Sequence, residues 1–205
     1  AKIYDAGKQR GEHRMTQTEI NKLLVDLGSA GNNVCRLKGG DPFIFGRGGE
    51  EAIELTAAGI PWEVVPGISS TIAAPAYAGI PVTQRGISTS VTIVTGSEDP
   101  NKLDSTINWD ALARLSGTLV FVMAWKGMKD IVSALTSRGM SKERSAALIQ
   151  WGTTAKQKVV TGPINEIVDR GVDAKIGAPV ALVVGEVADL RKSMSWFDQR
   201  PLFGK

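Results

Sequence analysis

The spacing of apolar residues along the chain alternates between two periods, that of a helix and that of a strand. In residues 16–31, Ile20, Leu24 and Leu27 recur at helical spacing and predict an amphipathic helix. Thr16 and Glu19 predict a capping box at its start, and the glycines that follow predict its end. The chain therefore opens with a well-delimited helix.

The later periodic segments are shorter and change type repeatedly. Strands are predicted at residues 33–37, 62–65, 88–96, 118–125, 145–152, 156–162 and 179–185. Helices are predicted at 49–58, 68–79, 109–115, 127–139 and 163–170, with a bend or interruption at Pro75 and with Pro163 in the first turn of the last helix. Because strands alternate with helices, the pattern predicts an α/β protein with largely parallel sheets.

A proline- and glycine-rich segment at residues 79–88 marks a link between two halves. We therefore expect an N-terminal α/β domain over 1–84, a C-terminal α/β domain over 85–192, and a tail or linker over 193–205. The sequence starts at Ala1 in what reads as the end of a strand. We expect that a preceding segment belongs to the same protein.

Composition narrows the class of protein but not its chemistry. The 205 residues are 42% hydrophobic and 22% charged, as in a globular protein with a sizeable core. The net charge of +3 is spread along the chain, so it permits an anionic ligand without indicating a nucleic-acid partner. No apolar run is long enough for a membrane span, and one histidine with one cysteine predicts no zinc cluster. The single cysteine, Cys35, lies in an apolar run, so we expect its side chain to be buried. One cysteine cannot form an internal disulfide, so we expect the protein to be cytoplasmic.

One stretch carries candidate chemistry: RLKGGDPFIFGRGGEE, residues 36–51, at a predicted strand-to-helix junction. Glycines at such a junction let a ligand approach bare backbone at the end of a strand. The stretch matches neither a phosphate loop nor the dinucleotide fingerprint, and Glu50 and Glu51 would repel a phosphate. These residues favour a ligand with little negative charge, and a tight turn without a ligand remains the alternative.

The same stretch, followed by GIPWEVVPGISSTIAAPAYAGIPVTQR, closely resembles the uroporphyrinogen-III C-methyltransferases of the tetrapyrrole methylase family. Further segments in the right order strengthen the resemblance, among them TLVFVMAW, IQWGTTAKQKVVTG and PVALVVGEVADLR. The resemblance implies a two-domain class III S-adenosylmethionine-dependent methyltransferase, with a largely parallel sheet in the first domain and a mixed sheet in the second. It implies C-methylation of uroporphyrinogen III at C2 and C7, through precorrin-1 to precorrin-2, for siroheme or cobalamin synthesis. S-adenosyl-L-homocysteine would be the product of the cofactor, and a homodimer is expected.

The resemblance also implies roles for particular positions. The expected cofactor-binding residues are Gly39, Gly40, Asp41, Ile44, Ser69, Ser70, Met123 and Gly152. Ser69 and Ser70 stand where the family commonly has Thr-Ala. Without the resemblance, a helix start at Ser69 and Ser70, core packing at Met123 and a turn at Gly152 would be the simpler interpretations.

Catalysis is expected from Lys8, which matches the family's proposed proton donor, while a solvated surface lysine is the alternative. His13 is expected in a structural or substrate-side role. Four arginines are candidates for contacts with substrate carboxylates: Arg14, Arg36, Arg47 and Arg85.

The sequence also departs from the family at both ends. It lacks the family's initial strand and G-x-G-P-G-D turn with its proposed proton acceptor, and its end resembles a junction to a fused uroporphyrinogen-III synthase domain. Two other interpretations stay open: a truncated fragment that binds cofactor or dimerises without catalysis, and a methyltransferase that acts on another tetrapyrrole.

Overall fold

A computed structural model describes residues 1–7, 15–102 and 104–197 of the chain. The chain divides into two compact units, which comprise residues 1–69 and 70–205. Each unit is described by itself below. The domain boundary that we expect at residue 84 stays a prediction, and the helix that precedes it belongs to the second unit here.

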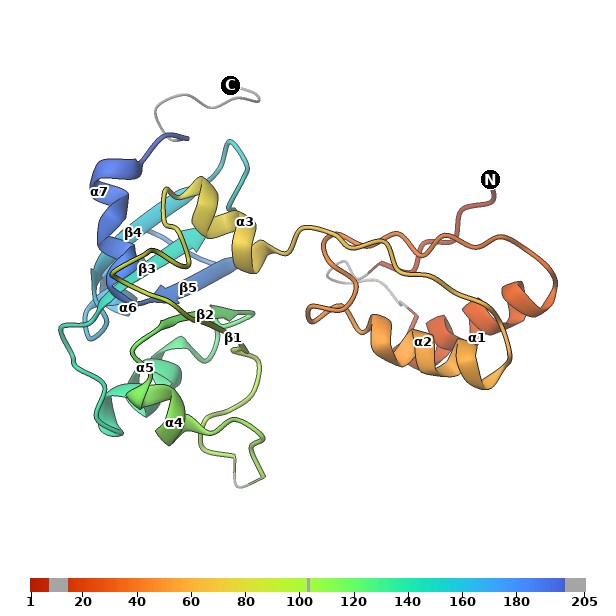
Figure 1. Cartoon of the computed structure of the whole chain (residues 1–205), viewed down its shortest axis with the longest axis horizontal. Coiled ribbons are helices and arrows are strands. Elements are labelled where there is room, and N and C mark those ends of the chain that lie inside the picture. The colour runs from red at the N-terminus through yellow and green to blue at the C-terminus, as the bar shows by residue number, and fades with distance from the viewer. Residues whose placement is uncertain (8–14, 103, 198–205) are drawn as a thin grey trace. The chain divides into compact units, whose positions relative to one another are not determined.

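The second unit is built on one five-stranded mixed sheet (Figure 1). Its strand order is β1-β2-β5-β3-β4, with β1 parallel to β2 and the other three pairings antiparallel. This sheet confirms the α/β class and the mixed sheet that the resemblance implied for the second domain. The largely parallel sheets expected from the alternation of strands and helices are not found in this unit, since only β1 and β2 pair in parallel. The strands are β1 (Val91–Thr95), β2 (Thr118–Val122), β3 (Ser145–Gln150), β4 (Lys158–Pro163) and β5 (Val180–Val184).

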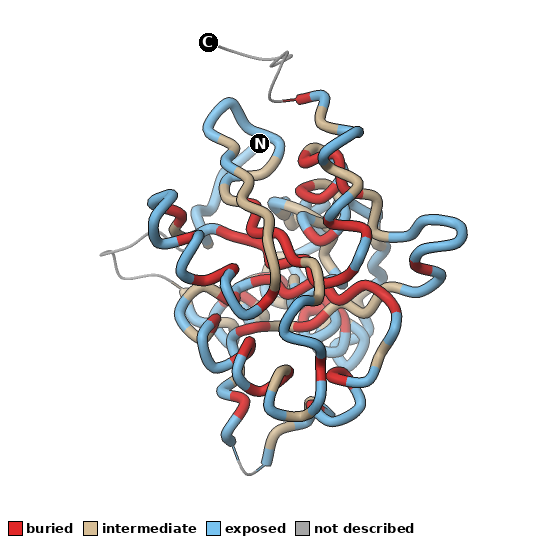
Figure 2. The backbone as a smooth tube through the Cα atoms, turned by 90° about the vertical axis from the view of Figure 1, so that its left-hand side faces the viewer, coloured by how far each residue is buried: buried red, intermediate tan, exposed pale blue. Residues whose placement is uncertain are grey.

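Every residue of β2 and β5 is buried, because helices cover both faces of this sheet. Figure 2 shows runs of buried residues along the backbone, separated by exposed loops. The helices are α3 (Ser70–Tyr77), α4 (Trp109–Arg114), α5 (Met128–Ser137), α6 (Ile167–Asp173), the 3-10 helix η1 (Glu186–Leu190) and α7 (Arg191–Met194).

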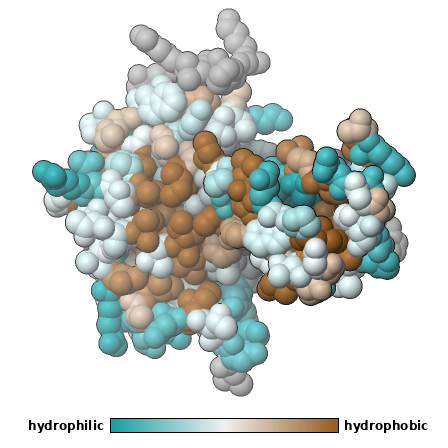
Figure 3. Space-filling view, turned by 45° about the vertical axis from the view of Figure 1, so that its right-hand side comes forward, coloured by the Kyte–Doolittle hydropathy of each residue, from teal (hydrophilic) through white to brown (hydrophobic). Residues whose placement is uncertain are grey.

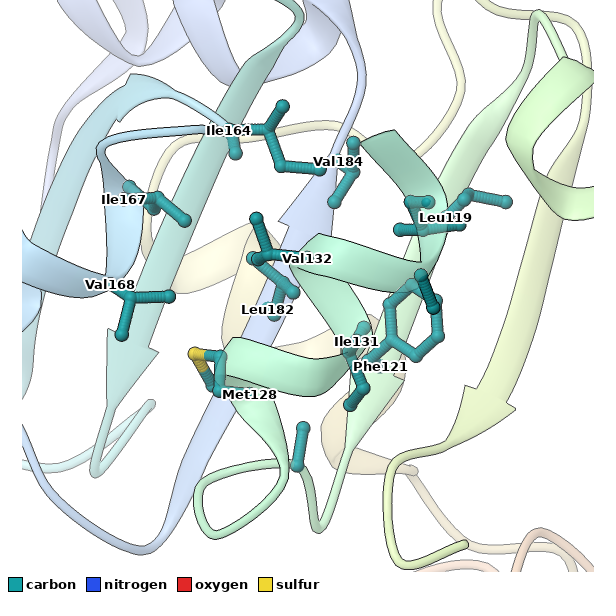
Figure 4. Packing of buried hydrophobic residues seen from close by; sticks show 14 of the residues in the cluster. Leu119, Phe121, Met128, Ile131, Val132, Ile164, Ile167, Val168, Leu182 and Val184 are labelled. Atoms are coloured by element: carbon teal, nitrogen blue, oxygen red, sulfur yellow. The ribbon is translucent and has the colours of Figure 1, made fainter. Parts of the chain in front are cut away.

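The larger core lies between one face of the sheet and α4, α5 and α6. Ile131 of α5 faces Phe121 of β2 and Leu182 of β5, and all three are completely buried (Figure 4). A smaller core on the other face joins Val120 and Val183 to Ala74 and Ala78 at the α3 side. The alternation of side chains along each strand supplies both cores at once.

Two predictions about proline in this unit need correction. Pro163 does not start a helix: it is the last residue of β4, opposite Ser145, and α6 begins four residues later. Pro75 lies inside α3, which continues to Tyr77, so the predicted interruption is absent, and the alternative, a bend at Pro75, stays a prediction. In both segments, packing against neighbouring residues outweighs the tendency of proline to start or to break a helix.

In the residues of the first unit that the structure describes there are two helices, α1 (Gln17–Ser29) and α2 (Gly48–Ala57). The predicted capping box is present, since Thr16 Oγ1 accepts from the Glu19 N–H at 3.2 Å and Glu19 Oε2 accepts from the Thr16 N–H at 2.5 Å. Glu51 of α2 is 6% exposed and accepts from Gln17 of α1 and from Arg36. This buried carboxylate joins both helices to the segment that follows α1.

The strands predicted at 33–37 and 62–65, and with them a parallel sheet in the first domain, do not form in the part of the first unit that the structure describes. Cys35, expected to be buried, is exposed. Hydrophobic side chains here remain at the surface (Figure 3): Leu37 is 82% exposed, and Val65 and Ile68 are each 77% exposed. An extended segment becomes a strand only when a neighbour pairs with its backbone, and no described segment does so here.

Candidate cofactor site

In the first unit, the predicted glycine turn is built around one carboxylate. Asp41 Oδ1 accepts from the N–H groups of Phe43 at 2.8 Å and Ile44 at 3.1 Å, and Oδ2 accepts from the N–H of Gly67 at 3.1 Å. The Phe43 and Gly67 hydrogen bonds, with that of Ile44, hold the pKa of Asp41 below its ordinary value. Asp41 therefore ties the turn to the segment that ends near residue 67.

Part of this turn has backbone that no neighbouring side chain covers. A Cβ atom added to Gly67 would lie 2.6 Å from the carbonyl oxygen of Gly40, so this close approach requires glycine. A Cβ added to Gly39 would meet nothing within 4 Å, and Gly39 is exposed. The backbone at Gly39 is thus open to a ligand, while the residues that follow it are held by the hydrogen bonds of Asp41 and by the close approach of Gly67 to Gly40. Sequence reasoning missed Gly67, although the Pro-Gly pair at 66–67 signalled a turn.

Ile44, the fourth predicted residue of this turn, is 41% exposed. Its neighbour Phe45 and the nearby Arg47 have positive φ angles of 51° and 60°, an uncommon conformation for residues with a side chain. Such conformations cost about 1–3 kcal/mol each and gather at functional sites. Their presence beside an open backbone favours a binding turn over a plain connection.

The candidate arginines differ in their partners. Arg36 pairs with Glu51 at 3.3 Å, and Arg47 pairs with Glu50 at 2.7 Å, a hydrogen bond that lowers the pKa of Glu50. Arg85 is exposed and makes no ion pair with any residue that the structure describes. Of these three, Arg85 is the one most available to a carboxylate of a substrate.

In the second unit, the carboxyl ends of β1, β2 and β3 lie at one edge of the sheet, because β2 and β3 are each antiparallel to β5. Met123 follows β2 directly, and Gly152 lies two residues after β3. Open α/β sheets bind ligands at this edge. The structure therefore brings two of the predicted cofactor residues to the same edge.

Backbone strain gathers at this edge as well. Met123, Trp151 and Thr153 have positive φ angles of 58°, 48° and 71°. Met123 is 54% exposed, so it does not fill the core, as the simpler interpretation would require. Strained residues with exposed side chains at strand ends are typical of binding sites.

Ser69 and Ser70 lie at the start of α3, and Ser70 is its first residue. One helical turn later, Ala74 packs so closely on Gly152 that an added Cβ at 152 would lie 2.5 Å from the Cβ of Ala74. Gly152 thus allows the β3–β4 loop to approach α3. The predicted helix start at Ser70 and the predicted turn at Gly152 are both present and are connected through one contact.

The predicted catalytic residue Lys8, together with His13 and Arg14, lies outside the described residues. Within the described ranges, no three His, Cys, Asp or Glu side chains gather in a way that would hold a metal ion. Among those same residues, no helix combines the length and apolar character needed to cross a bilayer.

Comparison with solved structures defines the structural class of the protein. The fold matches that of class III S-adenosylmethionine-dependent methyltransferases: a solved structure of uroporphyrin-III C-methyl transferase from Thermus thermophilus, complexed with S-adenyl homocysteine, has 31% identity and a TM-score of 0.70. The match covers 85% of this chain and 75% of that one.

Residues 1–168 match the family of Tetrapyrrole (Corrin/Porphyrin) Methylases. The chain belongs to this family. It is 46% identical over 190 residues to an S-adenosyl-L-methionine-dependent uroporphyrinogen III methyltransferase of Methanosarcina barkeri, covering 93% of this chain and 74% of that protein. It is 47% identical over 192 residues to a siroheme synthase of Pseudomonas aeruginosa. The match covers 94% of this chain but only 41% of the siroheme synthase.

Proposed function

We propose that the protein uses S-adenosylmethionine to C-methylate uroporphyrinogen III at C2 and C7, giving precorrin-2 by way of precorrin-1. The observation that supports the proposal most directly is the open backbone at Gly39, in a turn that the three hydrogen bonds of Asp41 hold together. Family membership and the names of the relatives in Methanosarcina barkeri and Pseudomonas aeruginosa support the substrate class.

The residues present fit such a cofactor. An electron-poor sulfonium ligand suits backbone carbonyls and apolar walls better than a basic pocket, and the turn offers bare backbone beside the exposed Ile44. The cofactor would supply an electrophilic methyl group. The proposed contacts come from Gly39, Gly40, Asp41 and Ile44, from Ser69 and Ser70, and from Met123 and Gly152.

The roles proposed for Asp41 and Arg85 follow from their geometry, and the role proposed for Lys8 follows from the family resemblance alone. Asp41 orients the turn by accepting hydrogen bonds from three backbone N–H groups. Arg85, exposed and without an ion-pair partner among described residues, is proposed to bind a substrate carboxylate. Lys8 is proposed as the proton donor. Alignment of a pyrrole carbon with the methyl group is the main task left to the protein.

Binding of S-adenosylhomocysteine, measured by calorimetry, tests the cofactor assignment. We expect Gly39→Val to weaken binding at least about tenfold, because the new side chain occupies space that the ligand needs. Gly49→Val is the matched control, since an added Cβ at Gly49 also meets nothing within 4 Å, but that residue lies in α2. Equal affinity of both variants and the unmodified chain would rule out the turn as the binding site.

Mass spectrometry after incubation with uroporphyrinogen III tests the reaction. Gain of two methyl groups supports the proposal, whereas methylation of a different tetrapyrrole alone supports the second candidate substrate. Binding of S-adenosylhomocysteine without transfer to any tetrapyrrole supports a fragment that binds or dimerises without catalysis.

Four further properties belong to the same proposal. We expect a homodimer, which sedimentation velocity tests, and a siroheme or cobalamin pathway. We also expect a cytoplasmic protein, since a single cysteine in 205 residues suits a reducing compartment. A fused uroporphyrinogen-III synthase domain downstream is proposed from the resemblance of residues 196–205 to such a junction.

A further inference from the structure

The carboxyl end of α3 is held by side chains from the β3–β4 loop, from α7 and from the residues that follow α7. A helix leaves its last carbonyl groups without partners inside the helix. Trp196 Nε1 donates to the carbonyl of Ala76 at 3.1 Å, and Gln157 Nε2 donates to the carbonyl of Tyr77 at 3.1 Å. Arg191 donates to the carbonyl at residue 78. Three consecutive carbonyls at this helix end are thus each bound by a side chain that is remote in sequence.

Gln157 has a second partner, which makes it a bridge. Its Oε1 accepts from the N–H of Thr153 at 2.8 Å, while its Nε2 donates to Tyr77. Thr153 has a φ of 71° and follows Gly152, the residue that packs on Ala74. A primary amide can accept and donate at once, so a single side chain fixes the strained loop and the helix end together.

Aromatic packing reinforces the same helix end. Tyr77 lies with its ring centroid 5.1 Å from that of Trp196 and 4.9 Å from that of Phe197. Phe197 is 3% exposed. Gly79 completes the contact, because an added Cβ there would lie 2.4 Å from the carbonyl oxygen of Met194. Residues 194–197 therefore pack onto the end of α3.

We propose that Gln157 is a positioning residue that sets the affinity for S-adenosylmethionine by fixing α3 against the β3–β4 loop. The proposal rests on the proposed function, since Ser70 at the start of α3 and Gly152 in the loop are both proposed cofactor contacts. α3 has only eight residues, so a displacement of its carboxyl end also displaces Ser70. The loop responds as well when a substitution at Gln157 removes the oxygen that accepts from the Thr153 N–H.

Two substitutions separate the two halves of the bridge. Gln157→Glu keeps an acceptor for the Thr153 N–H but removes the donor and sets a carboxylate against the Tyr77 carbonyl. Gln157→Met keeps the length of the side chain and removes both hydrogen bonds. We expect either variant to raise the dissociation constant of S-adenosylhomocysteine and the KM for S-adenosylmethionine about tenfold, with kcat changed less than about twofold.

A matched control distinguishes positioning from a loss of stability. Val168→Ala removes buried methyl groups from α6, which contributes to the larger core, whereas α3 packs into the smaller core on the other face of the sheet. We expect it to lower the melting temperature without changing the dissociation constant.

Trp196→Phe is a milder second test, because it keeps a ring against Tyr77 but loses the donor to Ala76, and it should weaken binding about threefold.

The outcomes separate this proposal from the function on which it rests. If the unmodified chain binds S-adenosylhomocysteine and both Gln157 variants bind it equally well, the positioning role is wrong and the proposed function stands. If affinity falls in Val168→Ala in step with the melting temperature, as in the Gln157 variants, the role of Gln157 is only structural. Absence of binding by the unmodified chain overturns both.

Discussion

The two units of this protein contain similar apolar segments, but the segments differ in strand pairing and in burial. In the second unit, Val120, Leu148 and Val183 lie in strands with a neighbour on each side and are completely buried. In the first unit, Leu37 and Val65 lie in extended segments that pair with no described strand and remain largely exposed.

This difference shows that an apolar run specifies a strand only together with its neighbours. β5 lies between β2 and β3 and bonds to both, so its backbone groups are paired and its side chains reach two cores. The segments at 33–37 and 62–65 carry a comparable pattern without such pairing. Burial therefore follows from the sheet, and not from the composition of the single segment.

Removal of a large side chain should separate the units most clearly. Phe121→Ala is expected to lower the free energy of unfolding by about 3–5 kcal/mol, because Phe121 is completely buried and stacks on Trp109 at 6.1 Å. Leu37→Ala, at an 82% exposed position, should change it by less than about 0.5 kcal/mol. Urea unfolding followed by circular dichroism measures both. A large loss in Leu37→Ala would show that the segment at 33–37 is packed in solution.

A second pair of substitutions compares close packing with open backbone. Gly152→Ala should cost about 1–3 kcal/mol, since the new methyl group would overlap the Cβ of Ala74. Gly39→Ala should leave stability within about 0.5 kcal/mol of the unmodified chain, because nothing lies within 4 Å of the added atom. Thermal unfolding distinguishes them, and equal losses would contradict the open turn at Gly39.

Sequence reasoning succeeded where local pattern and tertiary packing agree. The Thr16–Glu19 capping box and all five strands of the second unit were predicted from spacing alone. It failed where a partner decides: Pro163 is held in β4 by Ser145, and Cys35 is exposed because its segment has no neighbour among the described strands. In the candidate site, the resemblance supplied Gly39 and Gly152. The bridging contacts of Gly67 and Gln157 join positions 26 and 80 residues apart, which no local pattern reveals.

Acid should loosen the turn of the first unit through Asp41. Its pKa is lower in the folded chain than the ordinary value of about 3.9, because it accepts from backbone N–H groups. The stabilisation by this carboxylate is therefore complete above the unfolded pKa and is lost as the pH falls through the lower folded value. Amide chemical shifts of Phe43 and Gly67, followed by NMR during acid titration, should change together in that range.

Asp41→Asn is the control for this titration, since it keeps an amide oxygen as acceptor and cannot ionise. In the second unit, the pKa of Asp189 is also lowered, but there the partners are the Ser145 hydroxyl and the Lys192 ammonium. The shifts of Phe43 and Gly67 in Asp41→Asn should not follow pH in the same range. If they do, another group controls the turn.

The smallest effect on stability should come from the single cysteine, and its reactivity sharpens the comparison between the units. Because Cys35 is exposed, a thiol reagent such as Ellman's reagent should label the folded chain about as fast as the chain in urea. Cys35→Ser should change the free energy of unfolding by less than about 0.5 kcal/mol. Protection of the thiol in the folded chain, with a loss of stability in Cys35→Ser, would mean that the segment at 33–37 is covered in solution. In that case the apolar segments of both units would be buried, and the units would differ only in the partners that cover those segments.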